Sequence, residues 1–130
     1  SDDEWQSIDA IVGVESRGFI FASALAYAKN KSFLVVRKPK KLPPPVHSVS
    51  YSLEYGQDTL EMSSQFVGQR VLVVDDVLAT GGTLAATCQL CQQSGHSIEQ
   101  MLMLINLADL NTFTWQGLTP RALFRYGSEQ

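Results

Sequence analysis

The hydrophobic residues of this chain form short uninterrupted runs, separated by segments with helical spacing. The apolar runs predict strands at residues 8–14, 32–38, 71–74, 98–107 and 120–126. Between them, residues 19–29 and 83–94 are predicted to be helices, the second ending at Gly95. Uninterrupted apolar runs are typical of parallel strands covered by helices on both faces. The pattern therefore predicts an α/β fold with a mostly parallel central sheet flanked by helices.

Each predicted helix has an apolar face at helical spacing. The predicted core positions of the first helix are Phe21, Ala24, Leu25 and Ala28. In the second helix Leu84, Cys88 and Cys91 share one face. The spacing of the two cysteines also matches a redox Cys-x-x-Cys, but their position beside Leu84 favours a buried core face.

Residues 39–62 have a different composition from the rest of the chain. Three consecutive prolines, at positions 43–45, exclude a helix or a central strand there. Residues 51–62 alternate partly around Gly56, which predicts a small hairpin or a mobile flap. Flaps of this kind often close over substrates. Residues 106–118 are predicted to be irregular or briefly helical.

Length and charge limit the possible classes of function. The chain has 130 residues, which predicts a single domain over residues 1–130. Its net charge of -3 gives no electrostatic reason to expect nucleic acid as a partner, and no apolar run is long enough to span a membrane. The two cysteines imply no disulfide framework and favour a cytoplasmic location. His47 and His96 are isolated, so we expect no metal site built by the protein.

The strongest candidate for chemistry follows the central strand. There the apolar run ends in Asp75-Asp76, and a turn of small residues precedes the second helix. The turn contains Ala79, Thr80, Gly81, Gly82 and Thr83. Carboxylates accept hydrogen bonds from sugar hydroxyls, while backbone N–H groups at a helix N-terminus bind phosphate. The two acids followed by this turn therefore suggest a site for a ribose phosphate. The plainer alternative is an ordinary helix start capped by Thr80 or Thr83.

Basic residues follow the first two strands. Arg17, beside Gly18, has forked donors suited to pyrophosphate, although a solvated surface turn is the alternative. Arg37, Lys38 and Lys41 form a local basic cluster that suits a leaving pyrophosphate, and a solvated charge run is the alternative. Because parallel strands end at one edge of a sheet, both groups are expected near the acid pair.

Glu54 lies between Tyr51 and Tyr55 in the predicted flap. A carboxylate carried by a closing lid can act as a general acid or base at a ring nitrogen. The alternative is an exposed glutamate on a strand.

Four motifs occur in an order that resembles the adenine-specific branch of the type I phosphoribosyltransferase family. They are the residues 13–21, Arg37-Lys38 through Lys41-Leu42-Pro43, residues 50–56, and Asp75-Asp76 with the Ala-Thr-Gly-Gly-Thr turn. Neither a Walker A loop nor a Gly-x-Gly-x-x-Gly fingerprint is present. The resemblance covers about residues 11 to 107.

The resemblance implies transfer of the phosphoribosyl group of phosphoribosyl pyrophosphate (PRPP) to adenine, giving AMP and pyrophosphate. It implies a homodimer and Mg²⁺ carried by PRPP. Asp75 and Asp76 would hold the ribose hydroxyls, residues 79–83 the 5′-phosphate, and Glu54 a proton near adenine N7. Arg17, Arg37, Lys38 and Lys41 would face the pyrophosphate.

Two departures from the family affect these expectations. The family has a hood over the base ahead of its first strand, and part of the specificity for adenine resides in it; almost nothing precedes Ile8 in the sequence given, so the choice of base is not supported by these residues. An acid usually precedes the leucine after the late strand, where this chain has Asn106. A phosphoribosyltransferase for hypoxanthine, guanine or xanthine, and a non-catalytic PRPP-binding regulatory module, remain alternatives.

Overall fold

The computed structural model describes residues 2–53 and 55–127. Within them the strands form one seven-stranded sheet in the order β3-β4-β2-β1-β5-β6-β7. The strands are β1 Ala10–Val14, β2 Ser32–Arg37, β3 Val46–Leu53, β4 Gly56–Ser63, β5 Arg70–Leu78, β6 Ser97–Leu107 and β7 Arg121–Tyr126. The strands from β2 through β1, β5 and β6 to β7 are parallel, while β4 pairs in the antiparallel sense with both β2 and β3. The predicted mostly parallel α/β fold is confirmed.

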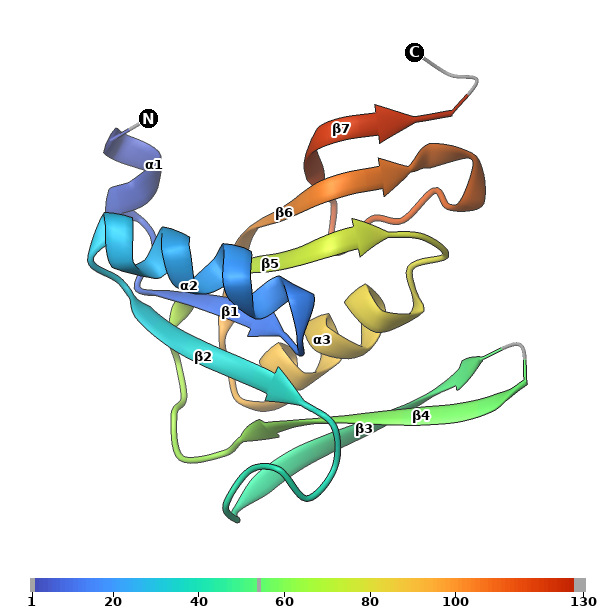
Figure 1. Cartoon of the computed structure of the whole chain (residues 1–130). Helices are drawn as coiled ribbons and strands as arrows, with labels where there is room; N and C mark the ends of the chain where they lie inside the picture. Colours follow the sequence, from blue (N-terminus) through green and yellow to red (C-terminus); the bar gives the residue numbers. More distant parts are fainter. Residues whose placement is uncertain (1, 54, 128–130) are drawn as a thin grey trace.

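Two long helices cover opposite faces of the sheet (Figure 1). They are α2, Arg17–Lys29, and α3, Gly82–Gln93; the short α1, Asp2–Gln6, precedes β1, and a 3-10 turn, η1, spans Ala108–Leu110. Ile11 of β1 packs in the cluster with α2, while Val12 packs in the cluster with α3. This alternation is what a strand between two helical layers requires. No helix among the described residues combines the length and the apolar character needed to cross a membrane.

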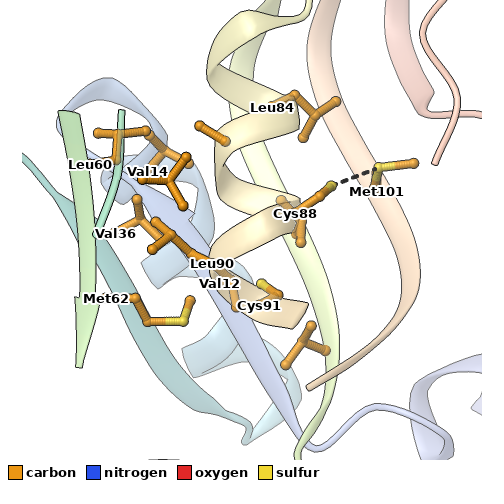
Figure 2. Packing of buried hydrophobic residues seen from close by; sticks show 14 of the residues in the cluster. Val12, Val14, Val36, Leu60, Met62, Leu84, Cys88, Leu90, Cys91 and Met101 are labelled. Atoms are coloured by element: carbon orange, nitrogen blue, oxygen red, sulfur yellow. Dashed lines mark hydrogen bonds between the residues drawn. The ribbon is translucent and has the colours of Figure 1, made fainter. Parts of the chain in front are cut away.

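The larger core cluster lies between α3, the central strands and the β3–β4 hairpin (Figure 2). Cys88 and Cys91 are fully buried there, and the Cys88 Sγ lies 3.8 Å from the Met101 Sδ. Burial raises the pKa of the Cys88 thiol to about 12, so the thiol stays protonated and unreactive at neutral pH. The prediction that these cysteines belong to the core is confirmed.

The predicted core face of α2 was partly wrong. Ala24 and Ala28 are exposed, and the buried positions are Gly18, Ala22 and Ala26, with Phe21 and Leu25 half-buried beside them. The reason is a close approach between the helix and β1. A Cβ on Gly13 would lie only 2.7 Å from the Cβ of Ala22, so this contact is made by the smallest residues rather than by the most hydrophobic ones.

The hairpin is longer than the predicted residues 51–62. It pairs β3 with β4 from Val46↔Ser63 to Leu53↔Gly56, so β3 begins directly after the prolines as an edge strand. Its attachment to the parallel strands is short, because β4 pairs with β2 only at Val36↔Met62 and Arg37↔Glu61. The hairpin therefore extends well beyond the strand that holds it (Figure 1).

Candidate functional site

Three segments that follow parallel strands meet at the carboxyl edge of the sheet. Residues 15–18 follow β1, residues 38–41 follow β2, and residues 79–83 follow β5 and lead into α3. Because β2, β1 and β5 are adjacent and parallel, segments that are distant in the sequence, such as residues 15–18 and 79–83, converge there. The structure brings together most of the residues that the sequence nominated.

The two acids at the end of β5 have different environments. Asp75 is only 7% exposed, and its Oδ1 accepts a hydrogen bond from the Asp76 backbone N–H at 2.8 Å. Gly18 covers it so closely that a Cβ there would lie 2.7 Å from the Asp75 Oδ1. Burial lifts the pKa of Asp75 to about 7, and the negative charge of the neighbouring Asp76 contributes to the increase. Asp75 is thus an enclosed carboxyl group that holds a proton readily.

Asp76 is the more accessible of the two acids. Its Oδ2 lies 2.7 Å from the Nε of Arg17, whose side chain is 79% exposed. Its Oδ1 accepts a hydrogen bond from the Val77 N–H at 2.8 Å. Arg17 is therefore held next to the acid pair by an ion pair at the surface, where a ligand can replace either partner.

The turn between β5 and α3 has the geometry of an anion cradle. Gly81 precedes the helix with a φ of 99°, a conformation that favours glycine, and no side chain caps the helix. The alternative of a helix capped by Thr80 or Thr83 is therefore wrong. The first N–H groups of a helix have no partner within it and carry positive partial charge. They are the groups that bind a phosphate.

Glu15 holds the basic residues of the second strand together. Its Oε2 lies 2.8 Å from the Lys41 Nζ, and its Oε1 accepts hydrogen bonds from the Lys38 N–H at 3.0 Å and the Arg37 Nε at 3.3 Å. These contacts lower the pKa of Glu15 to about 2, and the hydrogen bond from Lys41 has the largest effect, followed by that from the Lys38 N–H. Glu15 therefore stays ionised and holds the cations together at the carboxyl edge of the sheet.

The hairpin contacts both the basic cluster and the anion cradle. The Lys38 ammonium forms an ion pair with Asp58 of β4, and this hydrogen bond lowers the pKa of Asp58. The Tyr51 hydroxyl of β3 lies 3.5 Å from the Asp58 Oδ2 and 3.3 Å from the Thr83 Oγ1. The Tyr51 ring also lies 3.4 Å from where a Cβ of Gly82 would be. Tyr51 thus connects the hairpin to the first turn of α3.

Several site residues went unrecognised in the sequence. Glu15 was included only within the motif at residues 13–21, and Tyr51 was noted only as a neighbour of Glu54. Asp58 and Asn111 carried no signal, because their partners lie 20 and 32 residues away in the chain. Glu54 itself lies outside the described residues, so its predicted role stays a prediction. Among residues 2–53 and 55–127, no group of three or more His, Cys, Asp or Glu side chains is arranged to hold a metal ion.

Comparison with known proteins gives a consistent result. A family model described as a phosphoribosyl transferase domain matches residues 1–104. Adenine phosphoribosyltransferase of Hydrogenovibrio crunogenus is 47% identical over 123 residues, covering 95% of this chain and 71% of the relative. The enzyme of the same name from a Synechococcus strain is 56% identical over 107 residues, covering 81% of this chain but only 61% of the relative.

Solved structures agree with these relatives. Adenine phosphoribosyltransferase of Thermoanaerobacter pseudethanolicus superposes with a TM-score of 0.86 at 39% identity, covering 92% of this chain and 71% of that one. The Saccharomyces cerevisiae enzyme, complexed with an imino-altritol bisphosphate and adenine, gives 0.79 at 36% identity and covers 90% of this chain and 66% of its own. The Trypanosoma brucei enzyme, in complex with AMP, pyrophosphate and ribose-5-phosphate, gives 0.81 at 27% identity, with 91% and 56% covered.

Proposed function

Because the chain belongs to the phosphoribosyltransferase family, we propose that it acts in purine salvage, transferring the phosphoribosyl group of PRPP to adenine to give AMP and pyrophosphate. The relatives and structural neighbours with this activity in their names support the choice of adenine. The chain spans 61 to 71% of the length of the curated relatives described above.

The observation that carries the proposal is that acidic and basic groups lie together at one edge of the sheet. An acid pair and an anion cradle lie at the end of β5, and a cationic group lies at the ends of β1 and β2. PRPP has matching parts: a ribose diol, a 5′-phosphate and a pyrophosphate on the opposite side of the sugar. We assign the diol to Asp75 and Asp76 and the 5′-phosphate to residues 79–83.

The pyrophosphate is assigned to Arg17, Arg37, Lys38 and Lys41. Arg17 is bound to Asp76 in this structure. A ribose diol that hydrogen-bonds Asp76 would compete with this ion pair and free Arg17 for the pyrophosphate. The substrate would be the Mg²⁺ complex of PRPP, so the metal enters with it and offsets part of its negative charge.

In the proposed reaction, the bond from the anomeric carbon to the pyrophosphate oxygen breaks as the bond to adenine N9 forms. Positive charge develops on the sugar and negative charge on the leaving group. Fixed cations stabilise the departing pyrophosphate, and closure of the hairpin excludes water that would hydrolyse the sugar. Glu54 is proposed to handle the proton near adenine N7.

The proposal also includes a homodimer and a cytoplasmic location. A homodimer is supported by apolar side chains on the outer face of α2, where Ile20 is 76% and Tyr27 91% exposed. Two buried free thiols suit a reducing cytoplasm. Light scattering after size-exclusion chromatography would measure the dimer, and a monomer at micromolar concentration would refute it.

The test of function is formation of AMP from labelled adenine and MgPRPP, with hypoxanthine, guanine and xanthine as competing bases. We expect adenine-dependent release of pyrophosphate. Turnover with another base but not adenine would refute the adenine assignment. Binding of PRPP without turnover of any base would identify the chain as a regulatory binding module.

A further inference from the structure

The segment that follows β6 supports the anion cradle from behind. The side-chain amide of Asn111, just after η1, donates to the Ala79 backbone oxygen at 2.8 Å. The same nitrogen lies 3.1 Å from the Asn106 Oδ1 and 3.2 Å from the Leu107 backbone oxygen. Asn106 is itself buried, with 9% exposed. One amide group therefore ties the cradle to the end of β6.

The orientation of this amide is fixed from its other side. The Asn111 Oδ1 accepts a hydrogen bond from the Phe113 backbone N–H at 3.1 Å. An exchange of the nitrogen and oxygen positions would set two donors against each other here and two acceptors against each other at Ala79. The Phe113 side chain also lies 3.2 Å from where a Cβ of Gly81 would be, so the segment contacts both ends of the turn at residues 79–81.

The contact with Ala79 determines the direction of a backbone donor. In a trans peptide the C=O and the following N–H lie in one plane and point in opposite directions. Holding the Ala79 oxygen toward Asn111 therefore aims the Thr80 N–H away from the supporting segment. Backbone donors bind an anion well only when they are fixed in advance, because free rotation has to be lost on binding.

We propose that Asn111 is a positioning residue that preorganises the cradle for the 5′-phosphate. This inference rests on the proposed function, because it deepens the role assigned to residues 79–83. It requires an amide: Asn111 must donate to the Ala79 oxygen and accept from Phe113 at the same time. Neither a carboxylate nor an alkyl side chain does both.

The test compares the wild type with N111D and N111A, using two ligands. N111D keeps the shape of the side chain and the oxygen that accepts from the Phe113 N–H. If the Asn106 amide rotates, its N–H group can donate to the new carboxylate. The substitution therefore removes mainly the donor to the Ala79 oxygen. N111A is neutral and separates loss of the donor from added charge. We expect both variants to bind ribose 5-phosphate about three- to ten-fold more weakly, the change expected for one hydrogen bond. Inorganic pyrophosphate, assigned to the basic cluster, should bind within about two-fold of the wild type.

N30D is the matched control, since Asn30 is exposed at the end of α2. The steady-state readout is a raised KM for PRPP with kcat at saturating PRPP nearly unchanged. A lower melting temperature with unchanged ribose 5-phosphate affinity would overturn the inference, as would a loss in N111D that N111A does not share. Should N111A not fold, N111S replaces it as the neutral variant. A wild type that fails to bind ribose 5-phosphate would overturn the proposed function and this inference together.

Discussion

Replacing Asp75 by asparagine should make the protein more stable at alkaline pH while weakening its binding of ribose phosphate. Asn keeps the size of the side chain and the oxygen that accepts the Asp76 N–H, so the covering Gly18 need not move. What disappears is the ability to ionise in a buried position. In D75N the group remains neutral at every pH.

The pKa of Asp75 gives the size of the effect. The value rises from 3.8 to about 7 on folding, so the folded protein holds this proton more tightly than the unfolded chain. The resulting stabilisation of the protonated, folded form is complete below about pH 4 and is lost as the pH rises from about 4 to about 7. At about 1.4 kcal/mol per pH unit the whole change is roughly 4 kcal/mol, of which about 2 to 3 kcal/mol falls between pH 5 and pH 8.

The assay is urea unfolding of the wild type and D75N at pH 5 and pH 8. Other titrating groups, including Glu15 with its lowered pKa, are common to both proteins and cancel in the difference. We expect the stability of D75N relative to the wild type to increase by about 2 kcal/mol or more between the two pH values. Parallel pH profiles of stability for the two proteins would refute the view that the folded protein holds the proton of Asp75 more tightly than the unfolded chain.

Three further changes test the other contacts of the site. E15Q should weaken pyrophosphate binding by a few-fold at neutral pH. Because the pKa of Glu15 is lowered, its contribution to stability is present above about pH 4.5 and is lost as the pH falls toward 2. Between these pH values the stability of E15Q should therefore decrease less than that of the wild type. Y51F should increase hydrogen exchange in the hairpin, because it removes the hydroxyl that contacts Thr83. Y126F, at an exposed position in β7, is the control, and equal exchange in Y51F and the wild type is the refuting result. E54A should lower kcat at least ten-fold with ribose 5-phosphate affinity unchanged, and unaltered turnover would remove Glu54 from the mechanism.

The sheet and the location of the site were predictable from the sequence for one physical reason. Buried parallel strands are apolar throughout, so their ends are visible where polar residues begin, and those ends meet at one edge. Arg17, Lys41 and Asp76 were assigned to that edge from position alone, and the structure places them there.

What was not predictable depends on contacts between distant segments. The unequal burial of Asp75 and Asp76 results from Gly18, which is 57 residues away. The core face of α2 was misjudged because close packing against Gly13 selects small side chains, which a hydrophobicity pattern does not reveal. The support from Asn111 needs the folded position of a segment that has no regular pattern of its own.

The short attachment of the β3–β4 hairpin has a mechanical consequence. Since β4 joins β2 at only two residue pairs, the hairpin is anchored by Val49, Leu60 and Met62, which pack in the core, and its far end projects beyond them. Small rotations at these anchors become large displacements at the tip. Opening and closing should therefore break a few polar contacts near Tyr51 and Asp58 while leaving the sheet and both helical layers intact.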